Sequence, residues 1–422
     1  MAYRIAAIDV HKKVLMVVVA SGAEEVHDPA GQALDFECRR FGTLESDRGQ
    51  LIEWLQQRQV QEVVMESTAL YWRPIWLDME GKFGKLHLAQ AQSNRAPKGR
   101  KTDYKDAKRL ARRLLAGELM LSFVPEAEQR SWRDASRAKD HFVAERVRLQ
   151  NRVEALLEEM RIKLSGVISD LFGVSGRNIL AALAEGKKTD PQELAELGDQ
   201  RLACGKEKLA DALRGAPRQI HRKILEIHLQ ILNQYDEAIG KLDQLVAEQL
   251  KEHQGAVARL AEVPGFGVDS AQRFIAEVGA DAEAFPSAAE FGSWFGGCPG
   301  SNITAEQNHS AKSPKGNRYV RKLLTQAAQA AVRTKGCRFQ MLFRKFVSKQ
   351  AYPKAIWTIA HRLGKLAWKI LHDGVRYVEY GETSTPSAVK RRVQKHTQAL
   401  RKLGYTVTLA PLNSAQGAPC SA

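Results

Sequence analysis

Four acidic side chains, Asp9, Glu66, Asp103 and Asp106, have the types and positions that metal-dependent chemistry requires. Asp9 and Glu66 each follow a short apolar run, whereas Asp103 and Asp106 lie three apart at a predicted helix start, on one helix face. Carboxylates from two strand ends and a helix can converge, and such hard oxygen ligands suit Mg²⁺. A pair of these ions can hold the attacking and leaving oxygens of a phosphodiester displacement. Most acids of a protein are solvated, so the ordered set of four favours a metal site more than any single member does.

The elements that would position these acids alternate between strand and helix over residues 1–125. Apolar runs and periodicity predict strands at 3–9, 14–20, 33–41, 60–66 and 86–89, and helices at 44–59 and 102–116. With a further helix before the last strand, this order resembles the α/β fold of ribonuclease H and RuvC. In that fold, catalytic carboxylates cluster on the first and fourth strands and on the last helix. The four acids fall at these places.

Residues 126–255 are predicted to form long helices. Apolar residues recur there at three-to-four spacing with charged residues between them, which is typical of antiparallel helix pairs and coiled coils. The two apolar stripes consist of Phe142, Leu149, Val153, Leu156 and Met160, and of Ile220, Ile224, Ile227, Ile231, Tyr235, Ala238, Leu242 and Leu245. Two interpretations stay open, an internal helical bundle and a protruding coiled coil used for dimerisation.

Residues 256–380 are predicted to form a mostly α-helical C-terminal domain. Residues 381–422 are predicted to form a mobile basic tail, because no acidic residue follows Glu382. The Val-Pro-Gly-Phe-Gly sequence at 263–267 precedes a helical segment and resembles the turn of a helix-hairpin-helix. In that motif, backbone N–H groups of the turn bind a DNA phosphate. A purely structural turn before a helix would have the same sequence pattern.

The composition of the chain limits the kinds of partner that it can bind. The chain of 422 residues has a net charge of +16 and a pI near 9.6, which favours a polyanion. No apolar stretch is long enough to span a membrane, and the first residues lead directly into a strand, without room for a signal peptide. The five cysteines are scattered and support neither a disulfide framework nor a zinc site. We therefore expect nucleic acid rather than a membrane as the partner, and a cytoplasmic location at the bacterial nucleoid.

Two basic runs lie beside candidate site residues and contain no acid. They consist of Arg95, Lys98, Arg100 and Lys101, and of Lys312, Lys315, Arg318, Arg321 and Lys322. Arg318, Arg321 and Lys322 share one face of a predicted helix. A solvated helix face usually mixes charges of both signs, so that an unmixed basic face predicts contacts with phosphates.

Several motifs together resemble the DEDD-type insertion-sequence transposases of the IS one-ten family, which include the Piv- and MooV-like invertases. The resemblance covers nearly the whole chain. It rests on Ala-Ile-Asp-Val-His-Lys at 7–12, Met-Glu-Ser-Thr-Ala-Leu-Tyr-Trp at 65–72, Lys-Thr-Asp-Tyr-Lys-Asp-Ala at 101–107, Gly-Gly-Cys-Pro-Gly at 296–300 and Ser-Pro-Lys-Gly-Asn-Arg at 313–318.

The resemblance implies a covalent mechanism. Family members are thought to use a serine of the C-terminal domain to attack a DNA phosphate, with the acidic metal site binding the same phosphate. Covalent capture conserves the phosphodiester bond energy for rejoining. Several members use an RNA from the element to select target and donor DNA, which leaves the protein to read backbone shape.

This sequence departs from the family pattern at the nucleophile. The position of the family serine falls on Thr304, which keeps a hydroxyl but adds a methyl group that crowds attack. Ser301, Ser310 and Ser313 are the alternatives, and a weakened or inactive copy is a further interpretation.

The leading hypothesis is therefore a transposase or recombinase that exchanges DNA strands at element ends and target with Mg²⁺, a Ser/Thr nucleophile and a guide RNA. Two DNA partners held together would require a homodimer or tetramer, built on the long helices. The alternatives are a RuvC-like nuclease or Holliday-junction resolvase, which would use water as nucleophile, and a non-catalytic DNA-binding relative.

Overall fold

The computed structural model describes residues 3–22, 35–67, 69–91, 104–298 and 313–379, the backbone of 302–304 and 307–310, and short pieces between 393 and 408. The chain divides into two compact units, Met1–Glu126 and Ala127–Ala422, and each is described by itself. Among the described helices, none is long and apolar enough to cross a membrane.

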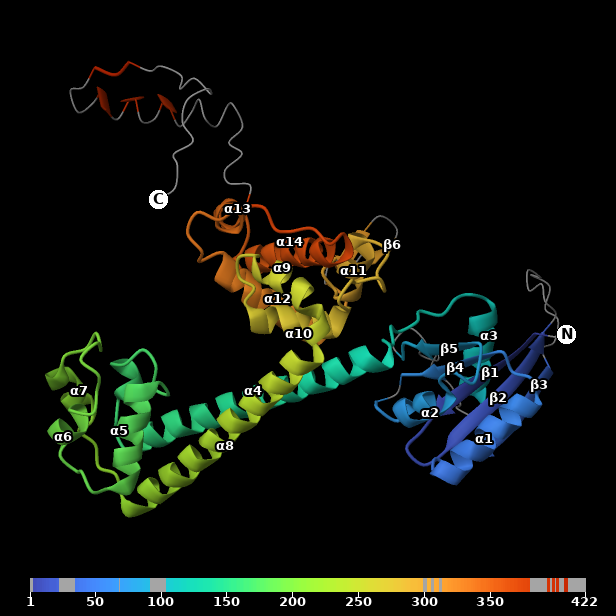
Figure 1. The fold of residues 1–422 in the computed structure, drawn as a ribbon, viewed down its shortest axis with the longest axis horizontal. Helices are drawn as coiled ribbons and strands as arrows, with labels where there is room; N and C mark the ends of the chain where they lie inside the picture. The colour runs from blue at the N-terminus through green and yellow to red at the C-terminus, as the bar shows by residue number, and fades with distance from the viewer. Residues whose placement is uncertain are drawn as a thin grey trace. The chain divides into compact units, whose positions relative to one another are not determined.

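The first unit is built on a five-stranded mixed sheet (Figure 1). Its strands are β1 (Tyr3–Val10), β2 (Leu15–Gly22), β3 (Asp35–Phe41), β4 (Glu62–Glu66) and β5 (Lys85–Ala89), in the order β3-β2-β1-β4-β5. The pairs β1–β2 and β2–β3 are antiparallel, whereas β1–β4 and β4–β5 are parallel. Helices α1 (Glu45–Gln57) and α2 (Trp72–Met79) alternate with the last strands, and α3 (Lys105–Leu115) follows. This predicted order of elements is confirmed, and it is compatible with a ribonuclease-H-like domain.

The two faces of this sheet are covered by different helices, as the period of two along each strand dictates. On one face, Ile8 and Met65 belong to a core that also contains the buried side chains of α1 and α2. On the other face, Ala7 and Val64 belong to a core with Leu110 of α3. Because β1 is buried on both faces, its apolar run is continuous rather than alternating.

In the second unit, two long helices, α4 (Ala127–Glu159) and α8 (Gln219–Gln249), pack side by side (Figure 1). Ion pairs join Lys139 to Asp243 and Arg146 to Asp236, so that residue numbers rise along α4 as they fall along α8. The pair is therefore antiparallel and forms within one chain. A coiled coil between chains stays a prediction.

The apolar stripe expected on α8 was only partly right. The buried positions are Leu225, Leu232, Ile239 and Val246, which repeat every seven residues, whereas Ile220, Ile227 and Leu245 of the expected stripe are exposed. The error arose because α8 carries apolar residues on two faces and only one of them meets α4. The distal halves of both helices share a core with α5 (Val174–Glu185), α6 (Pro191–Ala195) and α7 (Lys206–Ala212).

The C-terminal helices surround an aromatic core. They are α9 (Gln254–Ala261), α10 (Val268–Val278), α11 (Ala288–Trp294), α12 (Arg318–Ala331), α13 (Arg338–Val347) and α14 (Tyr352–His372). Phe274, Phe291 and Phe295 are fully buried and meet edge-on or tilted, with ring centroids 5.0 to 5.8 Å apart. These helices bear out the expectation of a mostly α-helical C-terminal region.

The turn between α9 and α10 packs inward. Gly265 has φ +92°, and a Cβ there would lie 2.1 Å from the carbonyl oxygen of Ala327 on α12. Val263 and Phe266 are buried. The two helices and the turn have the order of a helix-hairpin-helix, but this part of the turn serves packing, because its apolar side chains are needed in the core.

Candidate functional site

Asp9 and Glu66 occupy equivalent positions on neighbouring parallel strands. Ile8 of β1 pairs with Met65 of β4, and each acid is the next residue along its strand. By the alternation of side chains, both carboxylates lie on the face of Ala7 and Val64, which is the face that α3 covers. The sheet register therefore places these two predicted ligands at one edge and on one side.

Asp106 lies in the first turn of α3. It precedes Leu110, which is buried against the same sheet face, by one helical turn. The Asp106 carboxylate forms an ion pair with Arg109 at 3.1 Å. Asp103 lies outside the described residues.

His11, directly after β1, is a polar neighbour of Asp9. Its Nε2 lies 3.2 Å from Oδ2 of Asp9. Only 15% of the Asp9 side chain is exposed, so that the imidazole contacts a largely covered carboxylate. An imidazole in this position would orient a metal-binding carboxylate.

The chemistry of these donors suits a divalent cation, because they are carboxylates at one end of the sheet and on the helix that covers the same face. Among the residues that the structure describes, no three acidic, histidine or cysteine side chains come close enough together to hold a metal ion. The fourth predicted ligand, Asp103, is not among these residues, so the complete set of four stays a prediction.

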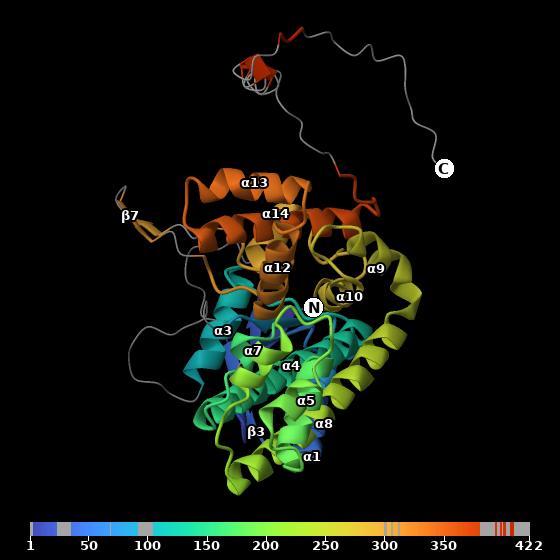
Figure 2. The same ribbon diagram turned by 90° about the vertical axis from the view of Figure 1, so that its left-hand side faces the viewer.

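Thr304 lies on a short hairpin of the second unit. Strands β6 (Asn302–Thr304) and β7 (Gln307–Ser310) are antiparallel, with Thr304 opposite Gln307 and Asn302 opposite Ser310. Figure 2 shows β7 standing clear of the C-terminal helices. The hydroxyl candidates Thr304 and Ser310 therefore lie on a protruding hairpin, whereas Ser301 falls outside the described residues.

The segment that carries the hairpin begins and ends at a close backbone crossing, which we call the neck (Gly296, Gly297 and Gly316). A Cβ on Gly316 would lie 2.1 Å from the carbonyl carbon of Phe295 and 2.3 Å from the nitrogen of Gly296. Gly296 has φ +72°, in the region that favours glycine. The Gly-Gly-Cys and Pro-Lys-Gly-Asn motifs thus meet at the neck, because only glycine permits two backbones to approach so closely.

Arg321 holds this neck instead of facing solvent. Its Nη1 donates to the carbonyl oxygen of Gly296 at 2.6 Å, and its guanidinium lies 4.3 Å from the ring centroid of Trp357. His361 lies under Gly297, and burial, followed by the nearby cations Lys365 and Arg362, lowers the pKa of this histidine. The neck is therefore lined by a fixed cation and a largely neutral imidazole.

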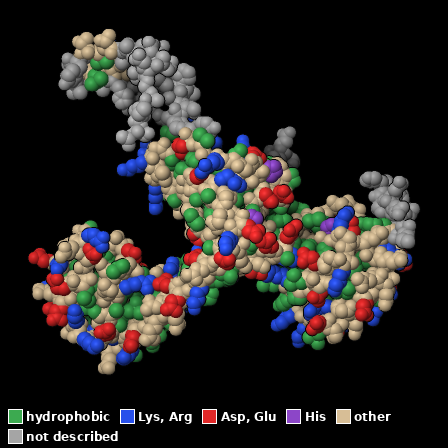
Figure 3. Space-filling model, in the orientation of Figure 1, with side chains coloured by type: hydrophobic (Ala, Val, Ile, Leu, Met, Phe, Trp, Pro, Cys, Tyr) green, Lys and Arg blue, Asp and Glu red, His purple; other side chains and the backbone are tan. Residues whose placement is uncertain are grey.

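The other predicted phosphate-binding cations have mixed surroundings. Lys315, Arg318 and Lys322 are exposed, but Lys322 forms an ion pair with Asp140 of α4 at 2.8 Å. The helix face that appeared unmixed in sequence is thus partly neutralised across the helix interface, and Figure 3 shows acidic side chains among the basic ones on this unit. The remaining candidates, Arg95, Lys98, Arg100, Lys101 and Lys312, lie outside the described residues.

Glu277 is a buried carboxylate that sequence reasoning did not single out. Only 2% of the residue is exposed. Its oxygens accept two hydrogen bonds from Arg137 of α4, at 2.7 and 2.8 Å, and one from the side-chain amide of Asn317, at 2.8 Å. Although burial lowers the pKa of Arg137, the Glu277 carboxylate holds that pKa above its usual value. Because Asn317 also caps α12, Glu277 ties α4 to the end of the neck.

Comparison with known proteins identifies relatives of both units. Residues 6–162 match a family model of DEDD-type IS110 elements described as transposase, and residues 257–344 match the transposase IS116/IS110/IS902 family. A curated relative, the insertion element IS900 uncharacterized 42 kDa protein of Mycobacterium paratuberculosis, is 29% identical over 156 residues. That match covers 36% of this chain and spans 38% of the relative's length.

Proposed function

Because the chain belongs to the IS110 family of DEDD transposases, we propose that it cleaves and rejoins DNA strands at the ends of an insertion element. The observation that carries this proposal is the equivalent placement of Asp9 and Glu66 at the ends of adjacent parallel strands. It is supported by the protruding hairpin, which carries a hydroxyl residue, Thr304, beyond the close backbone crossing of the neck.

The proposed site has two parts. In the first unit, Asp9, Glu66, Asp103 and Asp106 would hold Mg²⁺, which when bound would neutralise negative charge on a DNA phosphate. Asp9 would be oriented by His11, and Arg109 would limit repulsion at Asp106. The basic residues of the two runs, apart from the inward-facing Arg321, would hold neighbouring phosphates.

In the second unit, the Thr304 hydroxyl would act as nucleophile. Its oxygen would form a bond to phosphorus as the bond from phosphorus to one DNA oxygen breaks. The threonine proton would pass to water, and the leaving DNA oxygen would take up a proton from water to become a hydroxyl. Attack by a second DNA hydroxyl on the phosphothreonine would then restore Thr304 and complete strand exchange. The neck would limit the positions that the hairpin can adopt, which reduces the entropy lost in reaching the reactive arrangement.

Further parts of the proposal concern partners. A guide RNA would select the DNA sites, and a homodimer or tetramer would hold the two DNA partners. The exposed apolar residues Ile220 and Ile227 on the outer side of α8 offer a surface for such association.

The test is to trap the covalent intermediate. Purified full-length protein, retaining any RNA that co-purifies, would be incubated with element-end DNA and Mg²⁺, denatured, and mapped by mass spectrometry. We expect an adduct on the peptide that contains Thr304, retained in Ser310→Ala and lost in Thr304→Ala. Metal-dependent cutting without an adduct would instead support the resolvase alternative, and retained binding without cutting the non-catalytic one.

A further inference from the structure

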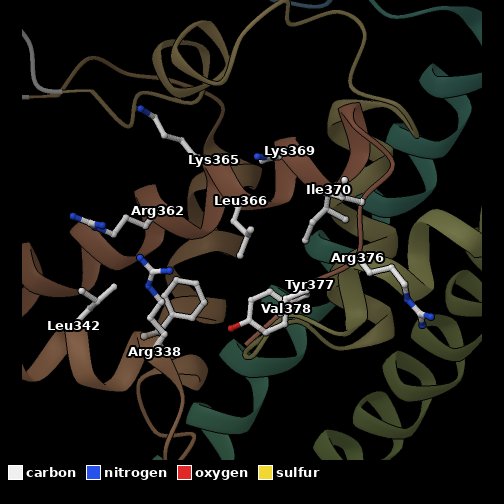
Figure 4. Close-up of a pocket in the computed structure, with 12 residues that line it drawn as sticks. Arg338, Leu342, Arg362, Lys365, Leu366, Lys369, Ile370, Arg376, Tyr377 and Val378 are labelled. Carbon is white, nitrogen blue, oxygen red and sulfur yellow. The ribbon is translucent and has the colours of Figure 1, made fainter. Parts of the chain in front are cut away.

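A cavity of about 710 Å³ lies in the second unit between α13, α14 and the segment 374–379 (Figure 4). None of the residues that line it belongs to the acidic site, the hairpin or the neck. Its walls are formed by Arg338, Phe339, Leu342, Arg362, Lys365, Leu366, Lys369, Ile370, Val375, Arg376, Tyr377 and Val378. The volume lies within the range typical of sites for small ligands.

The floor of the cavity is apolar. Figure 4 shows Leu366 and Ile370 pointing into it from α14, with the Tyr377 ring facing them. The Tyr377 hydroxyl donates to Glu379 at 2.5 Å, which fixes the direction of the ring. Val375 and Val378 at the mouth are 41% and 56% exposed. The cavity therefore offers a ligand the Tyr377 ring, the partly exposed Leu366 and the two exposed valines, whereas Ile370 is itself fully buried.

The rim of the cavity is basic. Arg362, Lys365 and Lys369 recur at three-to-four spacing along α14 and alternate with the two floor residues of that helix. Nε of Arg376 donates a 2.9 Å hydrogen bond to the Glu262 carboxylate. The Arg362 guanidinium lies over the Phe346 ring, 5.3 Å from its centroid.

The remaining rim cations are available to a ligand. The ammonium groups of Lys365 and Lys369 have no ion-pair partner among the residues that the structure describes, and no acidic side chain lines the cavity. The basic run along α14 extends over roughly 10 Å, at 1.5 Å per residue.

We infer that this cavity binds one unpaired base of a nucleic-acid strand, with the flanking phosphates held by Lys365, Lys369 and Arg338. Every base, whatever the sequence, has an apolar face that can stack on an aromatic ring. Such stacking beside basic side chains is the usual way in which proteins bind single strands. A duplex would reach the rim with its phosphates but could not place a stacked base in the cavity. The inference rests on the proposed function only in taking nucleic acid as the ligand.

The test compares strands that differ only in whether they carry a free base. The full-length protein would be titrated, in EDTA, with fluorescent single-stranded DNA, RNA of the same sequence, the DNA duplex, and a single strand with abasic positions. Leu366→Trp fills the cavity without a change of charge, and Leu245→Trp on α8, where the side chain is 47% exposed, is the matched control.

We expect Leu366→Trp to weaken single-strand binding about 10-fold and to leave duplex binding unchanged. Abasic positions should weaken binding to the natural protein by a similar factor but not to Leu366→Trp. If only the RNA binds more weakly to Leu366→Trp, the strand that the cavity binds is RNA. If the single-stranded DNA also binds more weakly, the cavity binds DNA. Equal losses on single strand and duplex, or no dependence on the base in the natural protein, would overturn the inference.

A second variant does not depend on repacking the cavity. Lys365→Gln with Lys369→Gln should lower the slope of log affinity against log salt by about 1.4 for single strands, at about 0.7 per phosphate contact. Lys187→Gln with Lys188→Gln, exposed lysines beyond α5, have the same change of charge and should leave the slope nearer its original value. Equal slopes for both pairs would exclude Lys365 and Lys369 as phosphate ligands. Because EDTA removes strand cleavage from the measurement, this result is separate from the adduct experiment.

Discussion

The side-chain amide of Asn317 donates a 2.8 Å hydrogen bond to Glu277, while the oxygen of the same amide accepts from the backbone N–H groups of Tyr319 and Val320. One side chain therefore caps α12 and joins it to a carboxylate that Arg137 of α4 also binds. Since Asn317 follows Gly316 directly, the orientation of the neck depends on this link. The asparagine of the Pro-Lys-Gly-Asn motif is thus explained by packing, without a contact to DNA.

Loss of the Glu277 carboxylate should be strongly destabilising. Glu277→Ala leaves Arg137 without its bidentate partner, and breaking a buried ion pair typically costs about 3–5 kcal/mol. Urea unfolding should show the midpoint falling accordingly. Glu283→Ala, an exposed acid after the same helix, should change the midpoint little. Equal effects of the two substitutions would show that the Glu277 network contributes nothing specific.

Replacing Asn317 by aspartate should separate its two roles. Asn317→Asp keeps an oxygen that caps α12 but places a second carboxylate beside Glu277, so its destabilisation at pH 7 comes from repulsion. Protonation of either carboxyl relieves that repulsion, and the deficit relative to the natural protein should shrink as pH falls from 7 to 4. Asn317→Ala loses the cap, at a cost of about 0.5–2 kcal/mol, with a weaker pH dependence. A deficit of Asn317→Asp that is constant with pH would contradict the close approach to Glu277.

The sequence allowed those residues of the candidate site to be placed whose positions local patterns determine. Asp9 and Glu66 could be placed because each directly follows an apolar run within its strand, and the strand order then sets their register. Glu277 and Arg137 are 140 positions apart and lie on helices whose contact depends on the whole second unit. No local pattern marks such a pair, although a glutamate within an apolar helix face was a signal that could have been followed.

The same reasoning explains the shifted apolar stripe on α8 and the surroundings of Arg321 on α12. Ile227 and Leu232 are equally apolar, and only the position of α4 decides which of them is buried. Arg321 has the spacing of a phosphate ligand, but the carbonyl oxygen of Gly296 and the Trp357 ring compete for it. Tertiary contacts thus select among residues that the sequence makes equivalent.

The neck should not tolerate a side chain. Gly316→Ala forces its Cβ against the backbone of Phe295 and Gly296, so that the two chain segments must move apart. We expect destabilisation of roughly 1–3 kcal/mol, as for overpacked cores, together with loss of the covalent DNA adduct. Gly240→Ala is the matched control, because it lies within α8 with open space around it and should stabilise by roughly 0.5–1 kcal/mol. An adduct yield unchanged in Gly316→Ala would show that the neck does not position the hairpin.

The first unit should lose stability in acid through Glu62. Burial raises the pKa of this carboxyl, but hydrogen bonds from Lys85, Tyr3 and His87 outweigh burial and leave it below its usual value. A carboxyl whose pKa is lower in the folded than in the unfolded protein stabilises the fold at pH values above its unfolded-state pKa. This stabilisation is lost as the pH falls through its folded-state pKa. Glu62→Gln should therefore be less stable than the natural protein at pH 7, and the difference should shrink below about pH 4. Thermal unfolding at several pH values measures this difference, and Glu53→Gln on the exposed side of α1 is the control.

Metal binding should depend on both Asp9 and His11. If Asp9 is a ligand, Mg²⁺ will raise the melting temperature of the natural protein by binding the folded state, and Asp9→Asn will abolish this rise while leaving the metal-free melting temperature unchanged or higher. His11→Ala should retain the rise but require roughly 10–100-fold more metal, because the imidazole orients the ligand without replacing it. Asp35→Asn, an exposed acid on β3, should behave as the natural protein does. An undiminished metal response in Asp9→Asn would place any metal elsewhere, whereas equal metal requirements for His11→Ala and the natural protein would make the 3.2 Å contact incidental.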